Sequence, residues 1–116
     1  MKSLKNDNNK RNFLFIKSEY KLIKINLNDV LFLSGLRDYT QIYIKGKASP
    51  LTTLQNLKEF ESKLPEDNFI RVHRSYIVAI NHIDTISRNE ISIGHSTIPI
   101  GNAYKAAFDE MIAKHS

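Results

Sequence analysis

The spacing of apolar residues in the first half of the chain is typical of β-strands. Apolar runs at residues 13–16 and 22–25 flank the polar segment 17–21, which predicts a β-hairpin. Residues 30–33 are apolar throughout and predict a further strand. Residues 39–44 alternate in polarity, so we expect a strand that shows one face to water.

The apolar spacing becomes helical over residues 53–64. One helical face would carry four positions, namely Leu54, Leu57, Phe60 or Glu61, and Leu64. Thr52 and Gln55 have the spacing of a capping box, and Pro65 ends the segment. We therefore expect the first helix here.

Strand-like runs return after this helix. They cover residues 69–72, 76–80, 83–86 and 90–93, with a hairpin turn predicted at Ser87-Arg88-Asn89. A last extended segment, Thr97-Ile98-Pro99-Ile100, follows them. Its proline restricts it to a sheet edge or a strand end, because proline has no backbone N–H to donate.

A second helix closes the chain. Asn102 is a favourable N-cap residue. An apolar stripe follows at helical spacing: Tyr104, Ala107, Phe108, Met111 and Ile112. We expect this stripe to dock on the sheets, and we expect any function of the helix to lie at its start.

Length and charge narrow the kind of protein. The 116 residues suffice for one domain, which we place at residues 12–116. Residues 1–11 are polar and without periodicity, as in a flexible arm or the end of a linker. The net charge of +5 favours an anionic partner. Because four of the cations lie in the first dozen residues, their placement matters more than their sum.

The sequence contains no pattern for a membrane, a metal or catalysis. It has no apolar run long enough to span a membrane, and it lacks cysteine, in keeping with the reducing cytoplasm. The four histidines have no metal-site spacing, and neither a glycine-rich phosphate loop nor a nucleophile elbow is present. We expect a cytoplasmic protein that is not an enzyme and uses no metal or cofactor.

The densest polar cluster lies between two apolar strand segments, at residues 71–75. Arg71, His73 and Ser75 would share one face of a straight strand, whereas Arg74 has the opposite parity. Arginine is suited to bidentate contact with guanine or phosphate, so Arg71, His73 and Arg74 are candidate DNA contacts. The alternative is that Arg71 or His73 braces a strand or caps a loop.

The same cluster resembles a family signature. Phe69 to Val78, followed by Asn81-His82-Ile83, is similar to F-x-R-x-H-R-S-[YF]-[IV]-V-N-x-x-x-I of LytTR domains, which bind DNA in bacterial transcription regulators. Segments 29–39, 52–64 and 98–104 resemble further family motifs in the same order. Ala79 and Asn102 depart from the pattern, since asparagine and a basic residue are common there.

The resemblance implies a mainly β fold: an elongated arrangement of small, mostly antiparallel sheets with two short helices packed alongside. DNA would be met by loops rather than by a recognition helix. The implied contacts lie in three places: Arg37, Asp38, Tyr39 and Thr40; the surroundings of Arg74; and Asn102, Tyr104 and Lys105 in the turn that begins at Gly101. The last group also stands at a predicted helix N-terminus, where backbone N–H groups favour phosphate.

Our leading hypothesis is sequence-specific binding of double-stranded promoter DNA, by a response-regulator output domain or a short stand-alone regulator. The resemblance implies binding in pairs on direct repeats, a possible homodimer on DNA, and control by a receiver domain and a sensor kinase. The alternative is a β-rich module that binds a protein or a small ligand and not DNA. A third hypothesis, an enzyme, would require a pocket with perturbed ionisable groups.

Overall fold

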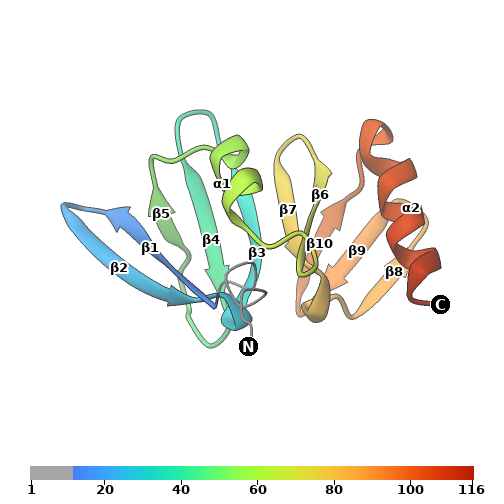
Figure 1. The fold of residues 1–116 in the computed structure, drawn as a ribbon, viewed down its shortest axis with the longest axis horizontal. Coiled ribbons are helices and arrows are strands. Elements are labelled where there is room, and N and C mark those ends of the chain that lie inside the picture. Colours follow the sequence, from blue (N-terminus) through green and yellow to red (C-terminus); the bar gives the residue numbers. More distant parts are fainter. Residues whose placement is uncertain (1–11) are drawn as a thin grey trace, which may run out of the picture.

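The computed structural model describes residues 12–116, whose strands form three antiparallel sheets (Figure 1). The central sheet has the order β5-β4-β3-β7-β6. Its strands are β5 (Leu51–Thr53), β4 (Thr40–Ile44), β3 (Val30–Gly35), β7 (Tyr76–Ala79) and β6 (Phe69–His73). The predicted arm at residues 1–11 lies outside the described residues.

Two smaller sheets and two helices complete the described fold. The N-terminal hairpin pairs β1 (Phe13–Ser18) with β2 (Lys21–Asn26), and the third sheet has the order β10-β9-β8. The strands of that sheet are β8 (Thr85–Ser87), β9 (Glu90–Ile93) and β10 (Ser96–Pro99). The helices are α1 (Leu57–Lys63) and α2 (Lys105–Lys114), with short 3-10 turns at Leu27–Asp29, Ile80–His82 and Asn102–Tyr104.

The central sheet is covered on both faces, which explains the apolar run in β3. Leu33 belongs to a core that includes the N-terminal hairpin and α1. Its neighbour Phe32 belongs to a second core, formed with β9, β10 and the fully buried Phe108 of α2. Successive strand residues point to opposite faces, so β3 supplies apolar side chains to both cores. The hairpin and α2 consequently lie at opposite flanks of the molecule (Figure 1).

This architecture confirms the expected mainly β fold with small antiparallel sheets and two helices. The dimensions are 41 × 40 × 25 Å, so the molecule is broad and thin rather than rod-like. None of the helices within residues 12–116 has the length and apolarity needed to span a membrane.

The start predicted for the first helix is wrong. Residues 51–53 form β5, and Thr53 is paired with Thr40 of β4. The capping box is made by Asn56 and Glu59, whose side chains each bond to the other's backbone N–H. Leu54, predicted on the buried face, is 82% exposed. The Thr52/Gln55 and Asn56/Glu59 pairs both have capping-box spacing. Pairing with β4 keeps residues 51–53 extended, so the helix begins after the second pair's cap.

The predicted cap of the last helix is also wrong. Gly101 is the N-cap of the 3-10 turn that leads into α2, and the side chain of Asn102 makes no capping hydrogen bond. The apolar stripe docks as expected through Phe108, with Met111 and Ile112 packed against the same core. Ala107 is exposed.

Candidate nucleic-acid interface

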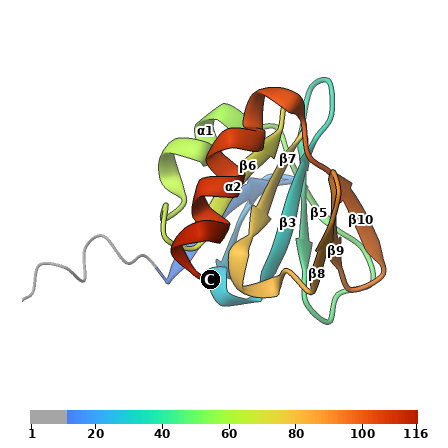
Figure 2. The same cartoon turned by 90° about the vertical axis from the view of Figure 1, so that its right-hand side faces the viewer.

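The strand order brings the three predicted DNA-contacting segments to one end of the molecule. β3 ends at Gly35 where β4 begins at Thr40, and the β6–β7 turn lies beside them because Ser34 pairs with Tyr76. The end of β10 leads into α2 at the same end (Figure 1 and Figure 2). We call this surface the loop edge; it comprises residues 36–39, 74–75 and 101–105.

Backbone hydrogen bonds tie these segments together. The N–H of Gly35 donates to the carbonyl of Ser75 at 2.8 Å, and the N–H of Gly101 donates to the carbonyl of Val72 at 2.8 Å. A Cβ on Gly101 would lie 3.6 Å from the Cα of His73 and 3.3 Å from the ring of Tyr104. Gly101 therefore allows the close backbone approach that its place in the sequence predicts.

The β6–β7 turn has Arg74 and Ser75 at its tip. A β-bulge between Arg71 and His73 shifts the register just before the turn. The bulge ends the shared-face geometry that a straight strand would give to Arg71 and His73. Arg74 is exposed, and within residues 12–116 its guanidinium makes neither a hydrogen bond nor an ion pair. It is free to meet a ligand.

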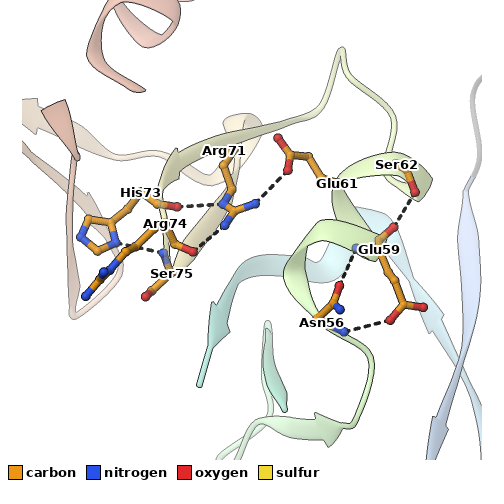
Figure 3. Close-up of polar contacts among 8 residues, drawn as sticks. All are labelled: Asn56, Glu59, Glu61, Ser62, Arg71, His73, Arg74 and Ser75. Carbon is orange, nitrogen blue, oxygen red and sulfur yellow. Dashed lines mark hydrogen bonds and ion pairs between the residues drawn. The ribbon is translucent and has the colours of Figure 1, made fainter. Parts of the chain in front are cut away.

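In Arg71, in contrast, each of the three guanidinium nitrogens makes a hydrogen bond (Figure 3). Its Nε donates to the carbonyl of His73 at 2.8 Å, and its Nη2 donates to the carbonyl of Arg74. Its Nη1 pairs with Glu61 of α1 at 2.8 Å, and only 16% of the side chain is exposed. The guanidinium also lies 5.8 Å from the ring centroid of Tyr104. These contacts favour the bracing alternative for Arg71.

The sequence names Glu61 only as the alternative to Phe60 on the apolar helix face, and not as part of the site. In the structure Glu61 falls on the exposed side of α1, and its side chain is half exposed. Its contact with Arg71 depends on how α1 crosses the sheet. Sequence spacing does not carry that information.

His73 also has a structural contact. Its Nδ1 accepts the backbone N–H of Ser75 at 3.0 Å, which closes the turn (Figure 3). Its ring packs edge-on against Tyr76, with centroids 5.5 Å apart. Together with its proximity to Gly101, this places His73 between the β6–β7 turn and the start of α2.

The β3–β4 loop combines exposed and buried residues. Arg37, Asp38 and Tyr39 are exposed, and the loop is closed by a hydrogen bond from the N–H of Leu36 to the carbonyl of Tyr39 at 2.7 Å. Thr40 is 0% exposed, and its hydroxyl donates to the carbonyl of Gln55 at 2.7 Å. The predicted DNA contact by Thr40 is thereby corrected: the residue anchors the loop and has no surface to offer.

The segment before α2 also carries exposed polar groups. Asn102 is exposed, and Tyr104 is half-buried against Arg71. Lys105 pairs with Asp109, with Nζ and Oδ1 3.5 Å apart, and 42% of its side chain remains exposed. Such an exposed pair holds a lysine weakly, so Lys105 remains available to an anion.

Other kinds of site have little support in the described residues. No group of three or more histidine or acidic side chains there could hold a metal. A cavity of about 280 Å³ lies at the opposite end, lined by polar residues such as Asn28 and His82 and by apolar ones such as Leu27 and Phe69. It is distant from the loop edge because it adjoins the start of β6 and the end of β7.

Fold and edge together define a class of protein: a small antiparallel β domain whose loop edge carries the cations Arg37, Arg74 and Lys105. Comparison with known proteins gives the particular family. Residues 20–113 match the family of the LytTr DNA-binding domain. The chain belongs to this family, and DNA binding in transcription regulation is its general function.

Relatives agree with the assignment. The sensory transduction protein LytT of Bacillus cereus is 30% identical over 105 residues, which cover 85% of this chain and 42% of the relative. LytT of Bacillus anthracis matches to the same extent. The chain thus spans less than half the length of these curated relatives.

A solved structure has the same fold. It is described as the LytTr DNA-binding domain of a putative methyl-accepting/DNA response regulator from Bacillus cereus. The two chains superpose with a TM-score of 0.74 at 27% identity, covering 88% of this chain and 97% of the other.

Proposed function

We propose that the domain binds double-stranded DNA sequence-specifically through the loop edge and so regulates transcription from a promoter. The observation that carries the proposal is the convergence of three segments, far apart in sequence, around Arg74, whose exposed guanidinium has no partner among residues 12–116. The exposed arginine of this turn suits the major groove, where arginine pairs with guanine O6 and N7.

The remaining residues divide into contacts and supports. Arg37 and Lys105 flank Arg74 on either side and would neutralise phosphates. Asn102, which stands where the family commonly has a basic residue, can accept and donate to adenine. Asp38 and Tyr39 are exposed hydrogen-bonding groups in the same loop.

The supports hold the contacts in place. Arg71 and His73 bond to backbone groups of the β6–β7 turn, and Thr40 anchors the end of the β3–β4 loop to the carbonyl of Gln55. We assign them to positioning. Their bonds fix the shape of the turn before DNA arrives, which reduces the ordering cost of binding.

The relatives' descriptions support a proposal for the setting of the domain. LytT is named a sensory transduction protein, and the structural relative is named a response regulator. We propose that this domain is likewise the output part of such a system, with a receiver domain and a sensor kinase upstream of it. The same proposal includes binding in pairs on direct repeats, with a homodimer on DNA. It also includes a cytoplasmic location and the absence of enzymatic activity.

A selection followed by titration tests the proposal. Duplexes bound by the domain are enriched from a random library, and the recovered duplex is compared with random duplex by fluorescence anisotropy at several salt concentrations. We expect the recovered duplex to bind at least about a thousandfold more tightly than random duplex, with a steep salt dependence. A folded domain that enriches no sequence would instead support the interaction module.

A further inference from the structure

The turn between β8 and β9 adjoins the loop edge. The N–H of Ile100 donates to the carbonyl of Asn89 at 2.8 Å. The β9–β10 register pairs Glu90 with Pro99, so its continuation places Arg88 opposite Gly101. Successive N–H groups of an extended chain point to opposite sides, which puts this turn on the side of Gly101 away from β6.

Four segments therefore form a row across this end of the molecule. Three backbone hydrogen bonds connect them: Gly35 to Ser75, Gly101 to Val72, and Ile100 to Asn89. The β3–β4 loop stands at one end of the row and the β8–β9 turn stands at the other. The β6–β7 turn and the start of α2 lie between them, so Arg88 stands at the far end of the row from the β3–β4 loop.

Arg88 occupies the first position of the two-residue turn between β8 and β9. Its φ is 48°, the left-handed value that such a turn requires and that glycine adopts at the lowest cost. Gly94 of the β9–β10 turn has a φ of 60°, and Glu19 of the β1–β2 turn has the same φ as Arg88, so the turn fixes the backbone of Arg88 but does not require its charge. Arg88 is exposed, and its side chain makes no hydrogen bond or ion pair within residues 12–116.

We propose that Arg88 binds a phosphate of the DNA backbone and makes the β8–β9 turn a fourth contact segment. The inference rests on the proposed function of the loop edge. A groove is bordered by phosphates on both sides, so when the central Arg74 enters it, a cation at the end of the row meets the backbone rather than a base. The contact would therefore add affinity without sequence preference.

The test compares Arg88→Gln with the matched control Lys47→Gln. Both substitutions remove one positive charge from an exposed turn, but Lys47 lies in the β4–β5 turn at the opposite end of the molecule. Each variant is titrated by fluorescence anisotropy against random duplex and against the selected duplex, over a range of salt concentrations. Arg88→Lys serves as the conservative variant, and the melting temperature shows that each protein is folded.

We expect Arg88→Gln to lower the slope of log affinity against log salt by about one, equally on both duplexes, while Lys47→Gln behaves as wild type. Arg88→Lys should restore the slope. Equal slopes for Arg88→Gln and Lys47→Gln would overturn the proposal, and a loss confined to the selected duplex would overturn the assignment to phosphate. Failure of the wild-type domain to bind either duplex would instead overturn the proposed function.

Discussion

At the scale of single residues, the two arginines of the signature have different surroundings. Arg74 is exposed and unpaired among the described residues, whereas Arg71 is held by two carbonyls and a carboxylate. The two arginines have opposite parity along the chain, and a bulge between Arg71 and His73 precedes the turn that carries Arg74. The same residue type is thus exposed at one position and held in hydrogen bonds three residues away.

Replacing Arg74 with alanine should weaken binding to the selected duplex by about 1–3 kcal/mol and relax the preference at one base pair. The free energy of unfolding should change by no more than about 0.5 kcal/mol, since the side chain is exposed. Titrations against single-base variants of the duplex would show which preference is lost. Wild-type affinity and selectivity would remove Arg74 from the interface.

Arg71→Lys keeps the charge but loses the forked donors. We expect the free energy of unfolding to fall by about 1–2 kcal/mol, because carbonyls of His73 and Arg74 lose their donors. Specific binding should weaken while the salt slope stays unchanged, because no phosphate contact is lost. A slope reduced in Arg71→Lys would mean that Arg71 binds phosphate directly.

Glu61→Gln should lower the free energy of unfolding by at most about 1 kcal/mol, because its ion pair with Arg71 is partly exposed.

At the scale of elements, the position of α1 depends on a glycine. A Cβ on Gly35 would lie 2.7 Å from Cδ1 of Leu57, the first residue of α1. The N–H of Gly35 also bonds to Ser75. Gly35 therefore permits the close packing of α1 on β3, and it also holds the β6–β7 turn in place.

Gly35→Ala should lower the free energy of unfolding by about 1–3 kcal/mol through overpacking against Leu57. The double substitution with Leu57→Ala removes the clash, so its effect should be smaller than the sum of the two single effects. Urea denaturation of the four proteins measures this coupling. Additive effects would show that an alanine at position 35 fits without a steric clash against Leu57.

Local patterns predict the elements of this fold better than their partners. The signature at 69–78 and the apolar run at 30–33 identify β6, β7 and β3, because strand periodicity is a short-range property. The start of α1 was mispredicted because Thr52 and Gln55 match the same capping pattern that Asn56 and Glu59 occupy. Pairing with β4, a long-range contact, decides between them.

The candidate site follows the same rule. Residue types and the family resemblance point to the three segments of the loop edge, but they do not separate contacts from supports. Burial of Thr40 and the bonds of Arg71 depend on neighbours distant in sequence. The local sequence predicts a turn at Arg88 but does not indicate a DNA contact there, because its place beside Gly101 arises from strand register.

At the scale of the whole molecule, residues 1–11 lie outside the described residues, and their sequence carries a net positive charge. Deleting these residues removes Lys2, Lys5, Lys10 and Arg11 together with Asp7. We expect weaker binding to random duplex and a flatter salt dependence. Binding curves at three salt concentrations measure this, and an unchanged slope would show that this segment does not contact phosphates.

The central claim is that the loop edge, and not the opposite end, faces DNA. Because the chain has no cysteine, a single introduced thiol can carry a DNA-cleaving iron chelate. Ala106→Cys places it on the first turn of α2, and Ala48→Cys places it in the β4–β5 turn; both positions are exposed. Bound to the selected duplex, the Ala106→Cys conjugate should cut both strands beside the site, and the Ala48→Cys conjugate should leave them intact. Stronger cutting from residue 48 would contradict the account.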